Sequence, residues 1–170
     1  DIVVINAGSS KGSDDFTCEI LEKNGQMLHH MLAQGPGRHC SSAMLDGTPV
    51  IGISGPPVGA EFTVDWMVKP LVDAYLGLPS EYPPMVFVRM DEAPEFWPEH
   101  VQVVKRGLIV RDENDELHCR TLQDTEERPK LRGLDRANCF ITYGKGVTRW
   151  EAGEWHPVEL RWPYMFPAER

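Results

Sequence analysis

The hydrophobic pattern of the first half of the chain alternates between short apolar runs and segments with apolar residues at helical spacing. Residues 2–5 (IVVI) form an unbroken apolar run, which is typical of a parallel strand covered on both faces. A second strand is predicted at 26–33 (QMLHHMLA). A short stretch near 41–45 then leads through an Asp-Gly turn into a third strand at 48–54 (TPVIGIS). The first half is therefore expected to contain a β-sheet.

Two helices are predicted beside these strands. The first runs from about residue 14 to residue 24, and we expect it to end at Gly25 in a left-handed conformation. One side of it carries Phe16, Ile20 and Leu21. The second runs from about 57 to 76, and Pro70 is expected to kink or interrupt it. Its apolar residues at helical spacing are Val58, Phe62, Met67, Leu71 and Tyr75.

The second half has a different rhythm. Residues 77–84 (GLPSEYPP) are rich in Gly and Pro and are interpreted as a linker. Beyond them, 100–122 alternates with period two around a polar turn at 112–116 and predicts a β-hairpin. Further strands are predicted at 138–144 and 156–162. The predicted fold class is therefore α/β plus all-β, with a small barrel-like domain in the second half.

Composition and charge narrow the range of functions. The chain has 170 residues, is 41% hydrophobic and carries a net charge of −9, which argues against nucleic-acid binding. Basic residues near 128–136 are interleaved with acidic ones, as on a solvated face. No apolar run is long enough for a transmembrane helix, so no membrane partner is expected. The four cysteines show no CxxC spacing, which favours a reducing, cytoplasmic location. The start at Asp1, without Met, suggests a fragment of a longer protein.

Several motifs occur in a specific order. A Gly/Ser loop that ends in Asp-aromatic-Thr (5–17, INAGSSKGSDDFT) follows the first strand, and a PG loop (34–39, QGPGRH) comes next. The stretch ISGPPVGA (53–60) joins a strand to a helix, and NCFI and GEW lie in the second half. This order resembles the C-terminal half of the MoeA family, the molybdopterin molybdenumtransferases, which include the corresponding domain of gephyrin.

The resemblance has implications for fold and activity. It implies that residues 1–79 are the later part of a three-layer, MogA-like molybdopterin-binding domain, and that 84–166 are the small C-terminal β domain of MoeA. Members of this family release AMP from adenylated molybdopterin and insert molybdate, with a divalent metal such as Mg²⁺ assisting. They act as homodimers whose cleft lies between subunits. Adenylated molybdopterin and molybdate are therefore the expected substrates.

The first loop has the properties of an oxyanion site. Backbone N–H groups at a helix N-terminus favour anions because the peptide dipoles are aligned there. Glycines allow the backbone to approach a ligand closely, serine hydroxyls add donors, and a lysine adds countercharge. The candidate ligand-binding residues of this loop are Gly8, Ser9, Ser10, Lys11 and Gly12.

Asp15 is the candidate catalytic and metal-binding residue. It matches the aspartate of the family pattern G-G-x-S-x-G-x-x-D, where it would position a metal or water or orient the pterin. From the residues alone, an acid in the first helical turn also stabilises the helix dipole. Ser13 and Asp14 are interpreted as helix cap and first-turn acid, with a structural role.

The other two loops match the family in part. In QGPGRH, Arg38 stands where the family has the second of two lysines, and Gly35 replaces the first. Arg38 can bind oxyanions through two parallel N–H donors. In ISGPPVGA, Gly55 and Pro57 match, whereas Ser54 replaces a proline. Pro56 and Gly59 stand in place of the family's asparagine and serine.

These replacements leave alternatives open. The first hypothesis is a molybdenum insertase. The second is a non-catalytic homologue that binds pterin, nucleotide or molybdate as a sensor or scaffold, and the third is an interaction module. A zinc site is not favoured, because the neighbours His29-His30 and His118-Cys119 would point to opposite faces of a strand, and His39-Cys40 supplies only two ligands.

Overall fold

The computed structural model describes residues 1–6, 16–79, 83–95, 101–122, 136–144 and 146–161. The chain divides into two compact units, Asp1–Glu81 and Tyr82–Arg170. The division falls within the Gly/Pro-rich stretch 77–84. No helix in the described parts is long and apolar enough to cross a membrane.

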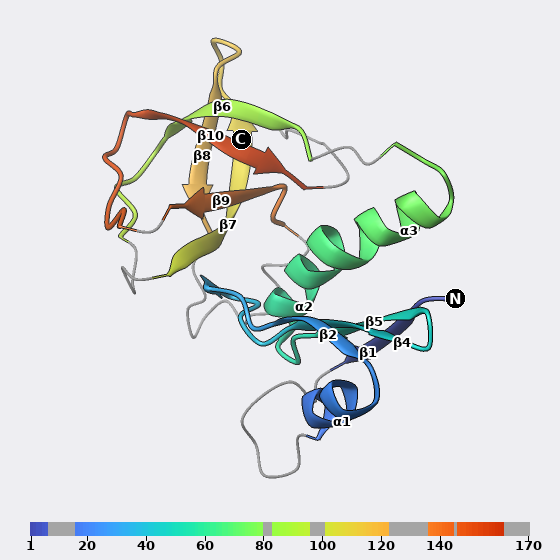
Figure 1. Ribbon diagram of the computed structural model, residues 1–170. Helices are drawn as coiled ribbons and strands as arrows, with labels where there is room; N and C mark the ends of the chain where they lie inside the picture. Colours follow the sequence, from blue (N-terminus) through green and yellow to red (C-terminus); the bar gives the residue numbers. More distant parts are fainter. Residues whose placement is uncertain (7–15, 80–82, 96–100, 123–135, 145, 162–170) are drawn as a thin grey trace. The chain divides into compact units, whose positions relative to one another are not determined.

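The first unit contains a mixed four-stranded sheet with the order β1-β5-β4-β2 (Figure 1). Its strands are β1 (Val3–Asn6), β2 (Gln26–His30), β4 (Ser41–Leu45) and β5 (Thr48–Ile53). β1 runs parallel to β5, and the other pairs are antiparallel. Asp46 and Gly47 have φ values of 49° and 78°, so the predicted turn joins β4 to β5. A two-residue strand, β3 (Gln34–Gly35), precedes β4 and was not predicted.

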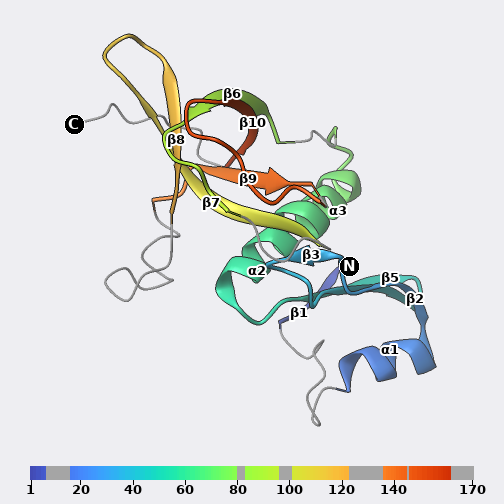
Figure 2. The same ribbon diagram turned by 90° about the vertical axis from the view of Figure 1, so that its left-hand side faces the viewer.

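Helices cover both faces of this sheet (Figures 1 and 2). α1 (Thr17–Asn24) packs its Leu21 against Ala43 and Val50. On the other face, α2 (Pro57–Thr63), the π-helical η1 (Val64–Val68) and α3 (Lys69–Tyr75) follow one another without a break. The result is a three-layer α/β unit, which confirms the predicted fold class for this half.

The predicted interruption of the long helix is a π-helical turn. The N–H of Lys69 bonds to the carbonyl of Val64, five residues earlier. Pro70 follows directly and has no N–H to continue an ordinary i→i−4 ladder. Widening the turn before the proline keeps the helix in one piece, as π-bulges commonly do.

The expectation that the first strand is covered on both faces was wrong. Val3 and Val4 are 42% and 44% exposed, because β1 is an outer strand whose neighbour in the described sheet is β5. In α1, Leu21 is buried, but Phe16 and Ile20 are 56% and 54% exposed. A helix of only 8 residues presents a narrow stripe to the sheet, so apolar residues at its edges stay outside.

Gly25 ends α1 in a different way from that expected. Its φ and ψ of −141° and −165° are extended, not left-handed. A Cβ at this position would lie 2.4 Å from the carbonyl oxygen of Met44. The glycine is therefore required by the close approach of β4, and not by the conformation of the helix cap.

The second unit is a closed five-stranded barrel. It consists of β6 (Met85–Met90), β7 (Gln102–Arg111), β8 (Leu117–Thr121), β9 (Cys139–Tyr143) and β10 (Trp155–Leu160). The order β7-β8-β6-β10-β9 closes through pairing of β9 with β7, and only β6 and β8 run parallel. Four of the strands were predicted, and β6 was not.

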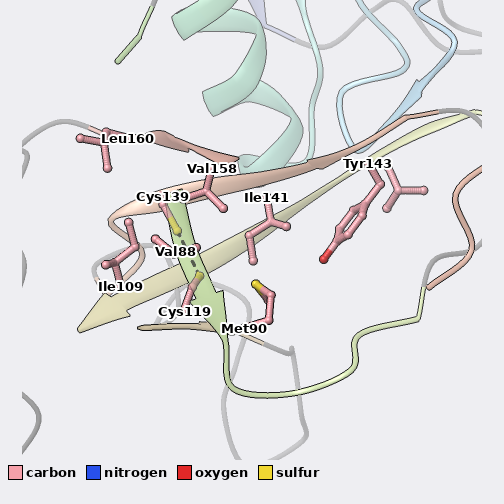
Figure 3. Packing of buried hydrophobic residues seen from close by; sticks show 10 residues of the cluster. Val88, Met90, Ile109, Cys119, Cys139, Ile141, Tyr143, Val158 and Leu160 are labelled. Atoms are coloured by element: carbon pink, nitrogen blue, oxygen red, sulfur yellow. Dashed lines mark hydrogen bonds between the residues drawn. The ribbon is translucent and has the colours of Figure 1, made fainter. Parts of the chain in front are cut away.

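The interior of the barrel is apolar. Figure 3 shows buried side chains that come from all five strands, Val88, Ile109, Cys119, Ile141 and Val158 among them. Gly107 makes room for the two central thiols, because a Cβ there would lie 2.6 Å from Cys139 Sγ and 3.0 Å from Cys119 Sγ. These two sulfurs lie 3.6 Å apart, and the hydrogen bond with Cys119, together with burial, raises the pKa of the Cys139 thiol.

Candidate functional site

The sequence-predicted site residues divide into two groups. Those of the first loop, Gly8, Ser9, Ser10, Lys11, Gly12 and Asp15, lie outside the described residues. Arg38, Gly55 and Pro57 are described, and all three are exposed. Their exposure makes them available to a ligand.

The strand register places the last residues of β1 and β5 side by side at one edge of the sheet. β1 and β5 are parallel neighbours, and Asn6, the last residue of β1, is opposite Ile53, the last residue of β5. Residues 7–15 and 54–56 therefore both continue from this edge. In open α/β sheets, ligands bind outside the carboxyl ends of the strands.

The second and third loops lie in direct contact. A Cβ at Gly59 would be 2.9 Å from the backbone nitrogen of Gly37, and a Cβ at Gly37 would be 3.4 Å from the carbonyl oxygen of Gly59. Gly37 also has a φ of +90°, which favours glycine. The backbone N–H of Leu32 donates to the carbonyl of Arg38 at 2.9 Å and closes the PG loop. The structure thus brings these two predicted loops together.

Ser54 places a hydroxyl group beside Gly59. The Ser54 side chain is buried, and its Oγ lies 2.7 Å from the position that a Cβ of Gly59 would occupy. In the pattern that this stretch resembles, the serine is at position 59 and position 54 has none. Here the two replacements are spatially linked, because the hydroxyl at 54 takes the space next to the glycine. In the sequence alone, the replacements at positions 54 and 59 are read as independent of each other.

The start of α2 offers backbone donors at this position. Pro56 precedes the helix with φ −62° and ψ 132°, and Pro57 occupies its first turn, where the missing N–H has no consequence. The first intrahelical bond runs from the Ala60 N–H to the Pro56 carbonyl, so the N–H groups of Val58 and Gly59 precede the ladder. The first turn contains no acidic residue. This arrangement is compatible with an anion.

One group in the second unit brings potential metal ligands together. Asp112, Glu116 and His118 place ligand atoms within 4.8 Å of one another. Asp112 Oδ1, however, accepts the backbone N–H groups of Asn114 and Glu116, both at 2.8 Å. Both ring nitrogens of His118 face carboxylates. The chemistry of this group is that of an ion-pair cluster, and we assign no metal to it.

Strand alternation at His118 and Cys119 confirms the sequence interpretation. Cys119 is buried inside the barrel, whereas His118 lies on the outer side. The sequence interpretation missed Asp112 and Glu116 as partners of His118. The signal was present, because residues on the two sides of a short hairpin turn face each other.

Comparisons with sequence families and curated proteins match the first part of the chain. The sequence model of a family described as "Probable molybdopterin binding domain" matches residues 1–74. The chain is 32% identical over 87 residues to the molybdopterin molybdenumtransferase of Staphylococcus epidermidis, a match that covers 51% of this chain and 21% of that protein. For the protein of the same name from Haemophilus influenzae, the identity is 36% over 72 residues, covering 42% and 18%. The chain spans about a fifth of the length of these relatives.

Solved structures match nearly the whole chain. A molybdopterin biosynthesis MoeA protein of Pyrococcus horikoshii superimposes with a TM-score of 0.71 at 21% identity, covering 94% of this chain and 37% of that one. A molybdenum cofactor biosynthesis protein of Pyrococcus furiosus gives 0.63 at 14% identity, covering 94% and 67%. At these low sequence identities, the structural similarity shows that this chain and the solved proteins share a fold.

The three comparisons agree with one another and with the structure. The family match covers the α/β unit, and the structural match extends over the barrel. Together they show that residues 1–74 match a probable molybdopterin binding domain and that the chain has the fold of the solved MoeA proteins.

Proposed function

We propose that this chain forms part of a molybdopterin molybdenumtransferase, which inserts molybdate into adenylated molybdopterin during molybdenum cofactor biosynthesis. Residues 1–79 would be the later part of the molybdopterin-binding domain, and 84–166 the C-terminal β domain. The observation that carries the proposal is the contact between Gly37 and Gly59. This contact lies in the same unit as the ends of β1 and β5, which are side by side.

The proposed roles follow from the chemistry of oxyanions. Molybdate and the phosphates of the substrate are anionic, and backbone N–H groups at helix starts bind such groups without side-chain bulk. Ser9 and Ser10 would add hydroxyl donors. Lys11 and Arg38 would supply positive charge, and the guanidinium of Arg38 can donate two parallel hydrogen bonds to one anion. Gly55 and Pro57 would shape the third side of the pocket.

Asp15 is proposed to hold Mg²⁺ or to orient the pterin. A bound Mg²⁺ would supply positive charge beside the phosphoryl oxygens. We further propose that the full-length protein acts in the cytoplasm as a homodimer, with its cleft between subunits. These finer points rest on the family resemblance.

A second candidate is a homologue that binds the same ligands without turnover. Gly35 carries no side chain where the family has a lysine, and nothing lies within 4 Å of its Cβ position. Pro56 is exposed and offers no amide for hydrogen bonding. The site would then bind pterin, AMP or molybdate with fewer polar contacts and act as a sensor or scaffold.

Complementation with the full-length gene tests the proposal. A bacterial strain that lacks its molybdenum insertase is expected to regain molybdoenzyme activity, both with and without excess molybdate. Failure to rescue, combined with retained binding of AMP or pterin by the purified protein, would favour the sensor.

The Asp15→Ala variant tests the role of the candidate catalytic residue. In the full-length protein we expect turnover to fall about 100-fold or more, because a group that holds a metal or moves a proton is lost. The free energy of unfolding should change by less than about 0.5 kcal/mol. Insertion of molybdate and urea unfolding are the two measurements. Asp14→Ala is the matched control and should retain turnover. Loss of folding without a separate loss of turnover would defeat the assignment.

A further inference from the structure

The tip of the β7–β8 hairpin holds an imidazole between two carboxylates. His118 Nδ1 lies 2.9 Å from Asp91 Oδ1, and His118 Nε2 lies 3.3 Å from Asp112 Oδ2. Asp91 follows β6 and Asp112 follows β7, so the ring bridges two segments that are distant in sequence. The His118 side chain is 18% exposed, which limits the competition of water for these contacts.

The two contacts have different requirements for protons. A neutral imidazole has one N–H donor and one acceptor nitrogen, so it can donate to only one of the two carboxylates. The lone pair of its other nitrogen then faces an anionic oxygen. Nδ1 makes a hydrogen bond to Asp91, whereas Nε2 makes no hydrogen bond within the described residues and lies near Asp112 Oδ2 as an ion-pair contact. An imidazolium carries a positive charge that attracts both carboxylates at once, so both contacts are favourable only in the protonated state.

We propose that His118 is a proton-operated clamp of the barrel. In the protonated state it fastens the turn 112–116 to Asp91 at the end of β6. Loss of the proton releases the contact to Asp112 and loosens the turn. The proposal concerns the second unit alone and does not depend on the function proposed above.

The surroundings of the ring favour the charged form. Besides Asp91 and Asp112, Glu116 presents an oxygen 3.9 Å from His118 Nε2. Two positively charged residues are also neighbours of His118 in the sheet. Arg89 of β6 is opposite His118 in the strand register, and Arg120 is two residues further along β8.

Further along the hairpin, Arg111 of β7 is paired with Asp115. The residue of β7 opposite His118 is the uncharged Val110. The hydrogen bond to Asp91 and the attraction of Asp91 and Asp112 raise the pKa of His118, although partial burial opposes them.

Release should affect the turn more than the strands. Asp112 Oδ1 accepts the N–H groups of Asn114 and Glu116 and thereby organises the turn. The same backbone hydrogen bonds, first that from Glu116, lower the pKa of Asp112, so this carboxylate stays ionised. Asp91 is also held by its own N–H, which donates to the Cys119 carbonyl at 2.9 Å. The β6–β8 connection therefore remains when the proton leaves.

The direction of the pH effect follows from linkage. The pKa of His118 is raised above its unfolded value of about 6.5. The stabilisation by the clamp is therefore fully present below that value and is lost as pH rises through the folded pKa. The turn should therefore open as the pH rises through this raised pKa.

Two measurements on the whole chain test the clamp. An NMR titration of the His118 ring should show a midpoint above about 6.5, lowered in both Asp91→Asn and Asp112→Asn. Hydrogen exchange of the amides at 112–116, corrected for the intrinsic pH dependence, should accelerate above that midpoint. In His118→Gln this pH-dependent step should disappear.

His156→Gln is the matched control. Its ring has similar exposure, 20%, but Nε2 faces one carboxylate, that of Glu154, at 3.1 Å. This variant should keep the pH-dependent step at 112–116. A His118 midpoint at or below about 6.5 would overturn the proposal. An unchanged step in His118→Gln would overturn it as well.

Discussion

Replacing Asn138 by leucine is expected to lower the free energy of unfolding of the barrel by about 2–5 kcal/mol. The Asn138 side chain accepts the N–H of Ile109 at 2.7 Å and donates to the carbonyl of the same residue at 2.9 Å. Both residues are buried. Leucine would leave the N–H and the carbonyl of Ile109 without these bonds in an apolar interior, where each unpaired group costs about 1–3 kcal/mol.

The position of Asn138 explains why a side chain, and not the backbone of a neighbouring strand, makes these two hydrogen bonds to Ile109. β9 begins at Cys139, which is opposite Gly107 on β7. Ile109 lies two residues further along β7, beyond the start of β9. The Asn138 amide takes the place that a strand backbone would have there and extends the sheet by one pair. The motif NCFI is thus explained by the fold of the barrel.

Urea unfolding of matched variants checks this prediction. Asn138→Asp keeps the size and the acceptor but removes the amide donor, so it should be destabilised as well. Asn114→Ala, in the exposed hairpin turn, is the control and should change stability by less than about 1 kcal/mol. An unfolding midpoint of Asn138→Leu equal to that of the unmodified chain would show that the two hydrogen bonds contribute nothing.

Replacing Gly59 by alanine is expected to weaken AMP binding about 10- to 100-fold, because displacement of one loop by about 1 Å misplaces its ligand groups. The new Cβ would lie 2.7 Å from Ser54 Oγ and 2.9 Å from the Gly37 nitrogen. One of these is backbone and cannot rotate away, so the PG loop must move. We also expect a loss of about 1–3 kcal/mol in the free energy of unfolding.

A double variant separates the two contacts. Ser54→Gly combined with Gly59→Ala relieves the contact with the hydroxyl but not that with Gly37, so it should restore affinity only in part. Gly35→Ala is the control in the same loop, since nothing lies within 4 Å of the added methyl group. Calorimetric titration with AMP gives the affinities. Equal affinities of Gly59→Ala and Gly35→Ala would contradict the proposed pocket.

Local patterns predicted most of the fold. Period-two alternation identified the β7–β8 hairpin, and the Asp46-Gly47 turn fixed the β4–β5 pair, because both signals depend on neighbouring residues alone. β6 escaped prediction although MVFVRM alternates, since Pro83 and Pro84 made its start look like linker. The exposure of Phe16 and Ile20 could not be predicted from the helical spacing, because tertiary packing decides how much of the helix the sheet covers.

The candidate site was harder to predict because its features are contacts between distant residues. The motifs named the loops 34–39 and 53–60 separately, and the structure places Gly37 against Gly59. The relation between Ser54 and Gly59 could not be foreseen, since it arises from the turn into α2. Within the His118 cluster, the contact with Asp91 could not be foreseen, because Asp91 follows β6 and is distant in sequence.

The most direct measurement of the central claim is an amide chemical-shift titration of the isotope-labelled chain with AMP. If the three loops form one oxyanion pocket, amides in 8–15, 35–38 and 54–58 should shift together and saturate with a single dissociation constant. Shifts confined to one of these segments would contradict the account, and so would segments that saturate at different AMP concentrations.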